Sequence, residues 1–190
     1  MTWLCVKYSG ARFLLVVALV ATIATACAEN VVPKRPPISV PMDLGRVPAT
    51  YEITVEVVDP TTYTVDVRFY IALPNEYSHF LDSQPTPEEA RKISRVLGGG
   101  VDPVTEKWIM TGVPAKFRVT ISNYHGGKSI LNEVVDHPDT LATYMGRYAE
   151  LVKLKLLPGI YIVKLEYAEG ATALATLHAE ILFAKAHHGK

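Results

Sequence analysis

The feature that most constrains the fold is a strict alternation of apolar and polar residues in two successive stretches. Residues 51–57 carry an apolar side chain at every second position, and the pattern resumes with Tyr63, Val65, Val67, Phe69 and Ile71. A period of two is typical of half-buried β-strands. The turn residues Asp59 and Pro60 between the stretches predict an antiparallel hairpin as the simplest connection. Because a hairpin cannot bury its own apolar face, a second sheet has to cover it.

Alternation continues in the second half of the chain. Further strands are predicted over residues 116–122, 129–135, 148–156, 160–167 and 177–183. Pro158-Gly159 predicts a second hairpin, and Ile38 to Val40 predicts an edge strand in which Pro41 is tolerated. Seven to eight short strands predict an all-β fold, an antiparallel β-sandwich of the immunoglobulin-like type, over residues 42–184.

One short helix is predicted inside a long connection between strands, which runs from Pro74 to Pro114. Thr86 fits the N-cap, and Pro87 fits the first helical position. Glu89 completes a capping box, the apolar stripe is Ala90, Ile93 and Leu97, and Gly98 to Gly100 end the helix. Connections of this length in compact domains are often functional.

The N-terminal residues resemble an export signal. Lys7 and Arg12 precede an apolar run from Phe13 to Ile23, and small residues follow before Cys27. Residues 1–26 are therefore predicted to be a signal peptide, residues 27–41 a proline-rich tether and residues 185–190 a polar tail. An uncleaved membrane helix is disfavoured because the apolar run is shorter than the ~20 residues of a bilayer span.

Cys27 separates two forms of export. Cys5 and Cys27 are the only cysteines, and Cys5 lies in the part to be removed, so the exported chain would keep one cysteine at its first position. This favours a lipoprotein signal with lipidation at Cys27, while ordinary secretion after Ala26 stays open. The expected location is the cell envelope, with the domain facing the periplasm. Ala28 after Cys27 favours the outer membrane, and the lipid at Cys27 makes the membrane a partner.

Composition and motifs argue against several functions. Lysine plus arginine and aspartate plus glutamate both number 19, so no net charge attracts nucleic acid. The chain has neither a G-x-S-x-G turn nor an H-E-x-x-H pair. Gly127-Lys128-Ser129 resembles the end of a phosphate-binding loop, but the required earlier glycine is absent, which favours a plain hairpin turn. The sequence therefore predicts no enzyme, no metal site and no cofactor.

Aromatic residues outside the alternating core are the remaining functional signal. Tyrosine and tryptophan surrounded by charges are typical of protein interfaces. The predicted partner-binding residues are Tyr70, Tyr77, Phe80, Trp108 and Tyr124. The alternative is that the long connection folds over an open end of the sandwich and that its rings fill the core.

Two motifs resemble a family of proteobacterial lipoproteins that carry a β-sandwich domain of unknown function. They are V-P-x-D-L at residues 40–44 and L-x-P-G-x-Y-x-V at residues 156–163. Some such proteins resemble, or are encoded beside, immunity proteins that neutralise periplasmic lipase effectors of type VI secretion. The resemblance implies a protein partner in the periplasm and supplies no catalytic residues.

These observations lead to one preferred function and one alternative. The preferred function is an envelope-anchored, non-enzymatic lipoprotein that binds another protein, with immunity against a periplasmic toxin as a specific form. The alternative is a β-sandwich of the envelope that binds a small ligand or a glycan.

Overall fold

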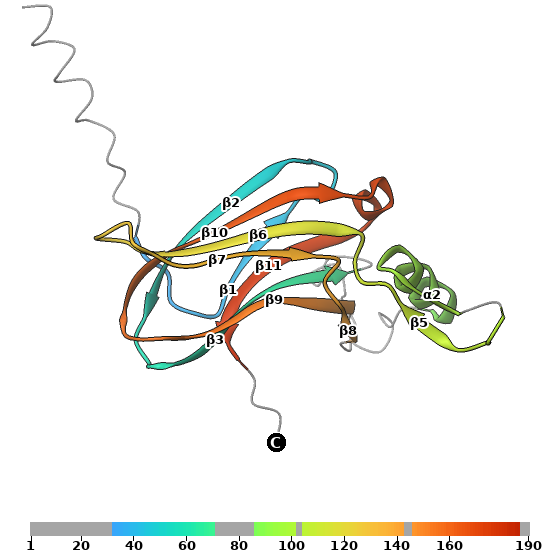
Figure 1. Cartoon of the computed structure of the whole chain (residues 1–190), viewed down its shortest axis with the longest axis horizontal. Coiled ribbons are helices and arrows are strands. Elements are labelled where there is room, and N and C mark those ends of the chain that lie inside the picture. Colours follow the sequence, from blue (N-terminus) through green and yellow to red (C-terminus); the bar gives the residue numbers. More distant parts are fainter. Residues whose placement is uncertain (1–31, 71–85, 102–103, 143–145, 187–190) are drawn as a thin grey trace, which may run out of the picture. The chain divides into compact units, whose positions relative to one another are not determined.

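The computed structural model describes residues 32–70, 86–101, 104–142 and 146–186 (Figure 1). The helices are α2 (Pro87–Val96) and the 3-10 helix η2 (Thr172–Thr176). The long strands are β1 (Ile38–Met42), β2 (Ala49–Val57), β3 (Thr61–Tyr70), β6 (Ala115–Asn123), β7 (Ser129–Asp136), β9 (Gly146–Leu156), β10 (Gly159–Gly170) and β11 (His178–Lys185). The short strands are β4 (Gly99–Val101), β5 (Trp108–Met110) and β8 (Leu141–Ala142).

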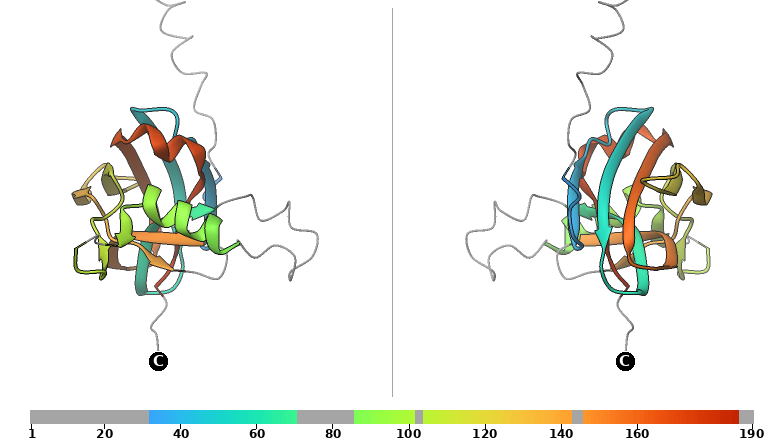
Figure 2. Two further views of the ribbon diagram at one scale, coloured as in Figure 1. Left: turned by 90° about the vertical axis from the view of Figure 1, so that its right-hand side faces the viewer. Right: turned by 90° about the vertical axis from the view of Figure 1, so that its left-hand side faces the viewer.

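The long strands form two antiparallel sheets that pack face to face. One sheet has the order β1-β11-β3-β9-β8, and the other has the order β2-β10-β6-β7. Figure 1 shows the two layers one above the other, and Figure 2 shows the same layers along their strands. The predicted all-β sandwich with one short helix is confirmed, and its predicted strands correspond to the eight long ones.

Both predicted hairpins are wrong, because each links the two sheets. β2 pairs with β10, whereas β3 pairs with β11 and β9, so the turn around Pro60 carries the chain from one layer to the other. The turn at Pro158 does the same between β9 and β10. Alternation could not distinguish a hairpin within one sheet from a turn that links two sheets. Strands that face each other across a core show the same period as strands that pair. The confirmed hairpin is β6–β7, whose turn includes Gly127 at φ 58°.

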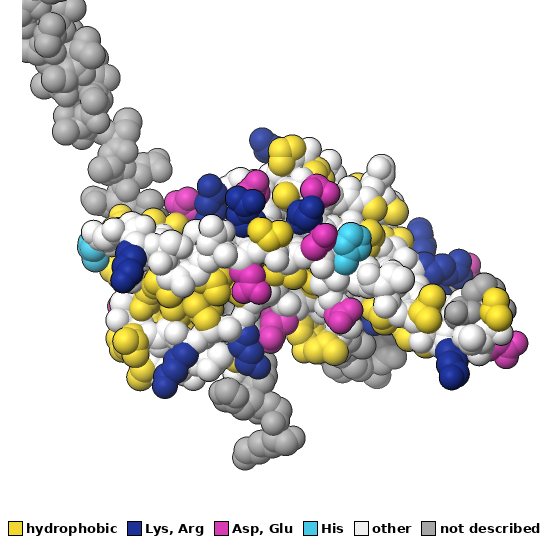
Figure 3. All heavy atoms as spheres, in the orientation of Figure 1, with side chains coloured by type: hydrophobic (Ala, Val, Ile, Leu, Met, Phe, Trp, Pro, Cys, Tyr) yellow, Lys and Arg dark blue, Asp and Glu magenta, His cyan; other side chains and the backbone are white. Residues whose placement is uncertain are grey.

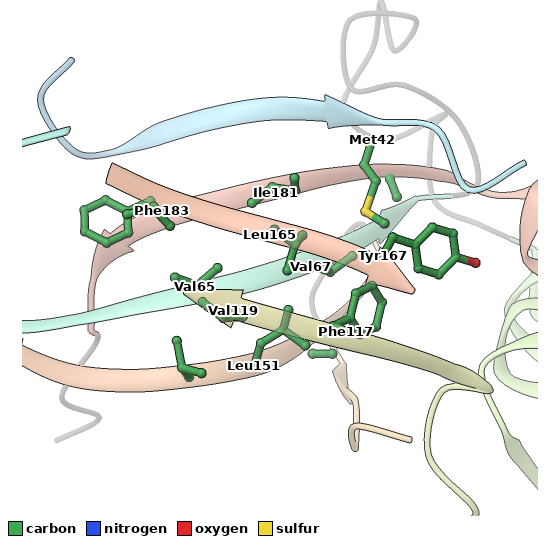
Figure 4. Close-up of a cluster of buried hydrophobic side chains, with 14 of the residues drawn as sticks. Met42, Val65, Val67, Phe117, Val119, Leu151, Leu165, Tyr167, Ile181 and Phe183 are labelled. Atoms are coloured by element: carbon green, nitrogen blue, oxygen red, sulfur yellow. The ribbon is translucent and has the colours of Figure 1, made fainter. Parts of the chain in front are cut away.

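The core lies between the sheets and includes the alternating apolar residues from Ile53 to Val57 and from Tyr63 to Phe69. Ile71, the last residue of the second alternating stretch, lies outside the described residues. Tyr63 stacks on Phe183 with ring centroids 5.4 Å apart, and Phe117 stacks on Tyr167 at the same distance. Figure 4 shows Phe183, Phe117 and Tyr167 converging from both sheets with the labelled residues Met42, Val65, Val67, Val119, Leu151, Leu165 and Ile181. All of them are buried, and their burial drives the association of the two layers.

The N-terminal part of the described chain is already attached to the sandwich. The predicted edge strand at Ile38 is confirmed as β1, which pairs with β11 and therefore begins inside the residues expected as a tether. Lys34 forms an isolated parallel bridge with Val55 of β2, and Arg35 Nε lies 2.8 Å from Glu56 Oε2. At the other end β11 runs to Lys185. Cys27 and residues 187–190 lie outside the described residues.

Among the residues that the structure describes, no helix has the length and apolar character needed to span a membrane. The helix α2 occupies the predicted place. Ala90 N donates to Thr86 O at 2.9 Å in the first turn, and Gly98 follows the last turn at φ 80°. Ile93 and Leu97 are buried as expected, whereas Ala90 is exposed.

Candidate functional site

The described part of the long connection forms a lobe at one end of the sandwich, made of α2 and the small hairpin β4–β5 (Figures 1 and 2). Sequence reasoning expected no strand here and took Gly98 to Gly100 only as a helix stop. In the structure Gly99 to Val101 pair with Met110 to Trp108. Three-residue strands that contain glycine fall below what alternation can detect, so the sequence carried no clear signal for this hairpin.

The lobe is fixed to the sandwich by buried contacts. Ile93 of α2 and Leu97, which directly follows the helix, belong to the same hydrophobic cluster as the sheet residues. Arg147 of β9 donates from Nη2 to Ser94 Oγ at 2.9 Å, and the Ser94 side chain is buried. Thr111 N donates to Gly98 O at 2.8 Å, which closes the hairpin onto the end of the helix. The lobe therefore has a defined attachment.

Trp108 is the most conspicuous side chain of the lobe. Its ring packs against Gly99, where an added Cβ would come within 2.8 Å of Trp108 Cζ2, yet the residue remains 51% exposed. Val101 stands opposite Trp108 in the β4–β5 register and is 59% exposed, and Ile109 is 43% exposed. Trp108 and Val101 thus form an apolar patch on the hairpin, as an interface anchor does.

Basic side chains lie on the helix of the same lobe. Arg91, Lys92 and Arg95 of α2 are all exposed. Lys92 and Arg95 line a shallow depression of about 460 Å³ with Thr86 and Glu88. Figure 3 shows basic and hydrophobic side chains near each other at this end of the visible face.

A second feature is a groove on the outer face of the five-stranded sheet. Its volume is about 600 Å³, within the usual range for ligand sites. The side chains come from four strands and include Ser39, Asp66, Arg68, Tyr148, Glu150 and Glu180. The register sets Arg68 between Glu180 on β11 and Tyr148 on β9. The groove therefore presents hydrogen-bonding groups of both charges beside one aromatic ring.

Glu180 organises one side of this groove. Tyr70 Oη donates to Glu180 Oε1 at 2.6 Å, and Ser39 Oγ donates to Oε2. Arg68 Nη1 lies 3.7 Å from Oε1. Burial raises the pKa of the Tyr70 hydroxyl above its ordinary value, and the bond to the Glu180 carboxylate raises that pKa further. Glu180 thus links β1, β3 and β11 on the outer face.

The structure separates the sequence-predicted aromatic residues. Tyr70 lies on the face of Asp66 and Arg68, as expected, but it is only 8% exposed and offers little area to a partner. Trp108 is exposed on the lobe, so it does not fill the core. Tyr124, 40% exposed in the β6–β7 turn, lies at the opposite end of β6 from the lobe (Figure 1). Tyr77 and Phe80 lie outside the described residues.

Among the described residues, no group of three or more histidine, cysteine, aspartate or glutamate side chains is placed to hold a metal ion.

The Gly127-Lys128-Ser129 segment lies in the β6–β7 connection, where Asn123 N donates to Lys128 O at 3.1 Å. That geometry confirms the plain hairpin turn.

The protein is a two-sheet β-sandwich with a lobe of one helix and one small hairpin, and it has a groove on the outer face of its five-stranded sheet. The family model "Domain of unknown function (DUF5625)" matches residues 39–185, and the chain belongs to this family. A crystal structure of a protein from Sulfurospirillum deleyianum is similar with a TM-score of 0.56 and 16% identity, covering 83% of this chain and 100% of that chain. At this identity the likeness shows the fold alone. No curated protein matches the sequence.

Proposed function

We propose that the protein is an envelope lipoprotein, anchored at Cys27, that binds another protein through the lobe formed by α2, β4 and β5 and catalyses no reaction. The observation that carries this proposal is the half-exposed Trp108 with Val101 beside it on a lobe that is packed onto the sandwich. Tryptophan is among the residues that contribute most to binding at protein interfaces. The basic residues of α2 favour a partner with acidic groups around its apolar contact.

A matched pair of variants tests the interface. The full chain and its Trp108→Ala and Tyr124→Ala variants are used to capture partners from envelope extracts. Both residues are exposed aromatics, but Trp108 lies in β5, which precedes β6, and Tyr124 directly follows the last residue of β6. We expect Trp108→Ala to lose the stoichiometric partner and Tyr124→Ala to keep it. Equal capture by both variants would remove the lobe from the proposal.

Tryptophan fluorescence gives a direct reading of the same contact. The chain has two tryptophans, Trp3 and Trp108, and Trp3 lies in the expected signal peptide. Emission from the processed protein therefore reports on the lobe alone. Burial of Trp108 by a partner should shift its emission to shorter wavelength, and an unchanged spectrum in the complex would contradict contact at this residue.

Within this proposal, the role we infer is immunity against a toxin of the periplasm, which the resemblance to immunity lipoproteins supports. Expression of the full chain should protect a sensitive strain against a toxin encoded by a neighbouring gene. Trp108→Ala should remove the protection while the protein still accumulates in the envelope. Protection by a chain that no longer binds the toxin would contradict this mechanism.

The groove favours a second function, the binding of a small ligand or glycan on the five-stranded sheet. Its polar lining around Tyr148 and Arg68 suits hydroxyl groups, and its volume suits a small molecule. A ligand at 100 times its Kd adds about 2.7 kcal/mol of stability. A thermal-shift screen of sugars should then raise the unfolding temperature of the full chain, and Arg68→Ala should abolish that rise.

A further inference from the structure

Three turns gather at the end of the sandwich that lies away from the lobe (Figure 1). They are residues 58–60 between β2 and β3, residues 124–128 between β6 and β7, and residues 157–158 between β9 and β10. The strand registers bring them together, because the residues that flank them are paired: Val57 with Gly159, Tyr161 with Asn123, and Leu156 with Thr61. These three turns are called the turn end, and the right-hand view of Figure 2 looks onto it.

Each turn of the turn end exposes one large apolar or aromatic side chain. Val58 is 51% exposed, Leu157 is 64% exposed and Tyr124 is 40% exposed. The backbone beneath Leu157 is fixed, because the buried Tyr161 donates from Oη to Leu157 O at 2.7 Å. Tyr124 is held beside the same turn, where its backbone N donates to Ile160 O at 3.0 Å. The turn end therefore presents three apolar or aromatic tips on a fixed backbone.

Basic side chains outnumber acidic ones around these tips. In the described stretches that form this end (34–35, 55–62, 123–129, 154–160 and 184–186), the basic side chains are Lys34, Arg35, Lys128, Lys155 and Lys185, and the acidic ones are Glu56 and Asp59. Glu56 pairs with Arg35, and Asp59 pairs with Lys185. The turn end therefore has an excess of positive charge, and Figure 3 shows basic and hydrophobic side chains together at this end of the visible face.

The described chain begins at this same end. Lys34 bridges to Val55, close to the end of β2, and Arg35 pairs with Glu56. Seven residue steps separate Cys27 from Lys34, and a fully extended chain of that length spans at most about 25 Å. A lipid on Cys27 would therefore hold the turn end close to the bilayer. Such a tether also raises the local concentration of the surface, so a weak affinity for lipid is sufficient.

We propose that the turn end docks on an anionic phospholipid bilayer, with Val58, Leu157 and Tyr124 in the headgroup region. This inference rests on the lipid anchor at Cys27 proposed above. Exposed apolar and aromatic tips favour the membrane interface, and the excess of positive charge favours anionic headgroups. Because the lobe lies at the other end of the sandwich, this docking presents Trp108 away from the membrane, where a partner can reach it.

Quenching of tryptophan fluorescence by brominated acyl chains tests which end reaches the bilayer. The full chain is expressed with its signal, purified from membranes and reconstituted in vesicles of brominated phosphatidylcholine and phosphatidylglycerol in equal parts. After the expected removal of residues 1–26, Trp108 is the only tryptophan and should not be quenched. In the double variant Leu157→Trp, Trp108→Phe the single tryptophan is at the turn end, and it should be quenched strongly.

Charge variants of this double variant test the electrostatic attraction. Lys128→Gln with Lys155→Gln should lower the ratio of docked to undocked protein about 30-fold at low ionic strength, which corresponds to about fivefold for each charge. The matched control is Arg118→Gln with Lys164→Gln, which removes the same charge from exposed positions on the four-stranded sheet. The control should leave the quenching unchanged. An equal loss of quenching in both pairs would contradict docking through the turn end.

Intact mass separates failure of the anchor from failure of the docking. A processed protein without acyl chains would remove the anchor, and this inference would fall with it. An acylated protein in which the tryptophan at position 157 is quenched no more than Trp108 would overturn the docking and leave the anchor in place. The docking is also wrong if envelope membranes shift the emission of Leu157→Trp to shorter wavelength while lipid vesicles do not, because a protein then covers this end.

Discussion

At the scale of single residues, the alternation assigned side chains to faces correctly but did not reveal how deeply they are buried. Asp66 and Tyr70 alternate with the apolar positions from Tyr63 to Phe69, which places them on the outer face of their strand, and they lie there. Both are nevertheless buried, because β3 lies between β11 and β9 and neighbouring side chains shield it from both sides. The position of Glu180 among Ser39, Arg68 and Tyr70 depends on strand order, which a period of two does not encode.

Tyr70 gives a prediction on pH dependence. Burial raises the pKa of the Tyr70 hydroxyl, and burial also raises the pKa of Tyr63 and Tyr167. A tyrosine with a raised pKa stabilises the fold fully below its ordinary pKa of about 10, and that contribution is lost as the pH rises above it. We therefore expect the free energy of unfolding to fall as the pH rises above about 10.

The Tyr70→Phe variant separates the contribution of this hydroxyl. Loss of the hydrogen bond to Glu180 should lower the free energy of unfolding by about 1 kcal/mol near neutral pH. The variant should also show a smaller loss of stability on going to alkaline pH, because one shifted group is gone. Urea unfolding at both pH values measures the two effects. An equal alkaline loss in the variant and the unsubstituted chain would show that Tyr70 does not contribute.

At the scale of elements, a helix or strand was predicted when several sequence features indicated it. It was missed when the sequence had no such feature. The helix α2 combined a cap, an initial proline, an apolar stripe and a terminal glycine, and it lies where expected. β4 and β5 had only three residues each, with two glycines in β4, and were not predicted. The connections at Pro60 and Pro158 were recognised as turns, but the elements that they join pair with other strands.

Two substitutions distinguish the buried and exposed parts of the lobe. Leu97 is fully buried in the core cluster, so Leu97→Ala should lower the free energy of unfolding by about 2–5 kcal/mol. Trp108 is half exposed, so Trp108→Ala should cost less than Leu97→Ala in stability while it abolishes partner binding. Chemical unfolding followed by far-ultraviolet circular dichroism compares them. A larger loss of stability in Trp108→Ala would show that the tryptophan is mainly a packing residue.

At the scale of the whole molecule, the sandwich was predictable because each long strand has one apolar face, and two such faces have to cover each other. The order of strands was not predictable from that rule. β1 and β11, which pair along their length, come from opposite ends of the sequence. The groove depends on this order, since Ser39, Arg68, Tyr148 and Glu180 come from four strands.

The place of β11 predicts how the chain tolerates truncation. β11 lies between β1 and β3, and it brings Ile181 and Phe183 into the core. A chain ending at Leu177 should therefore show no cooperative unfolding transition, since it loses an interior strand. A chain ending at Ala186 is the matched control and should unfold like the full chain. A cooperative transition in the shorter chain would contradict the importance given to β11.

The late position of β11 also determines when the protein can acquire its shape. Among the described strands of the larger sheet, β11 comes last in the sequence but lies in the interior, so a nascent chain cannot complete this sheet until β11 has been made. Strand pairs so distant in sequence also form slowly. If the protein is exported as proposed above, this delay would keep the chain extended during its passage through a translocation channel.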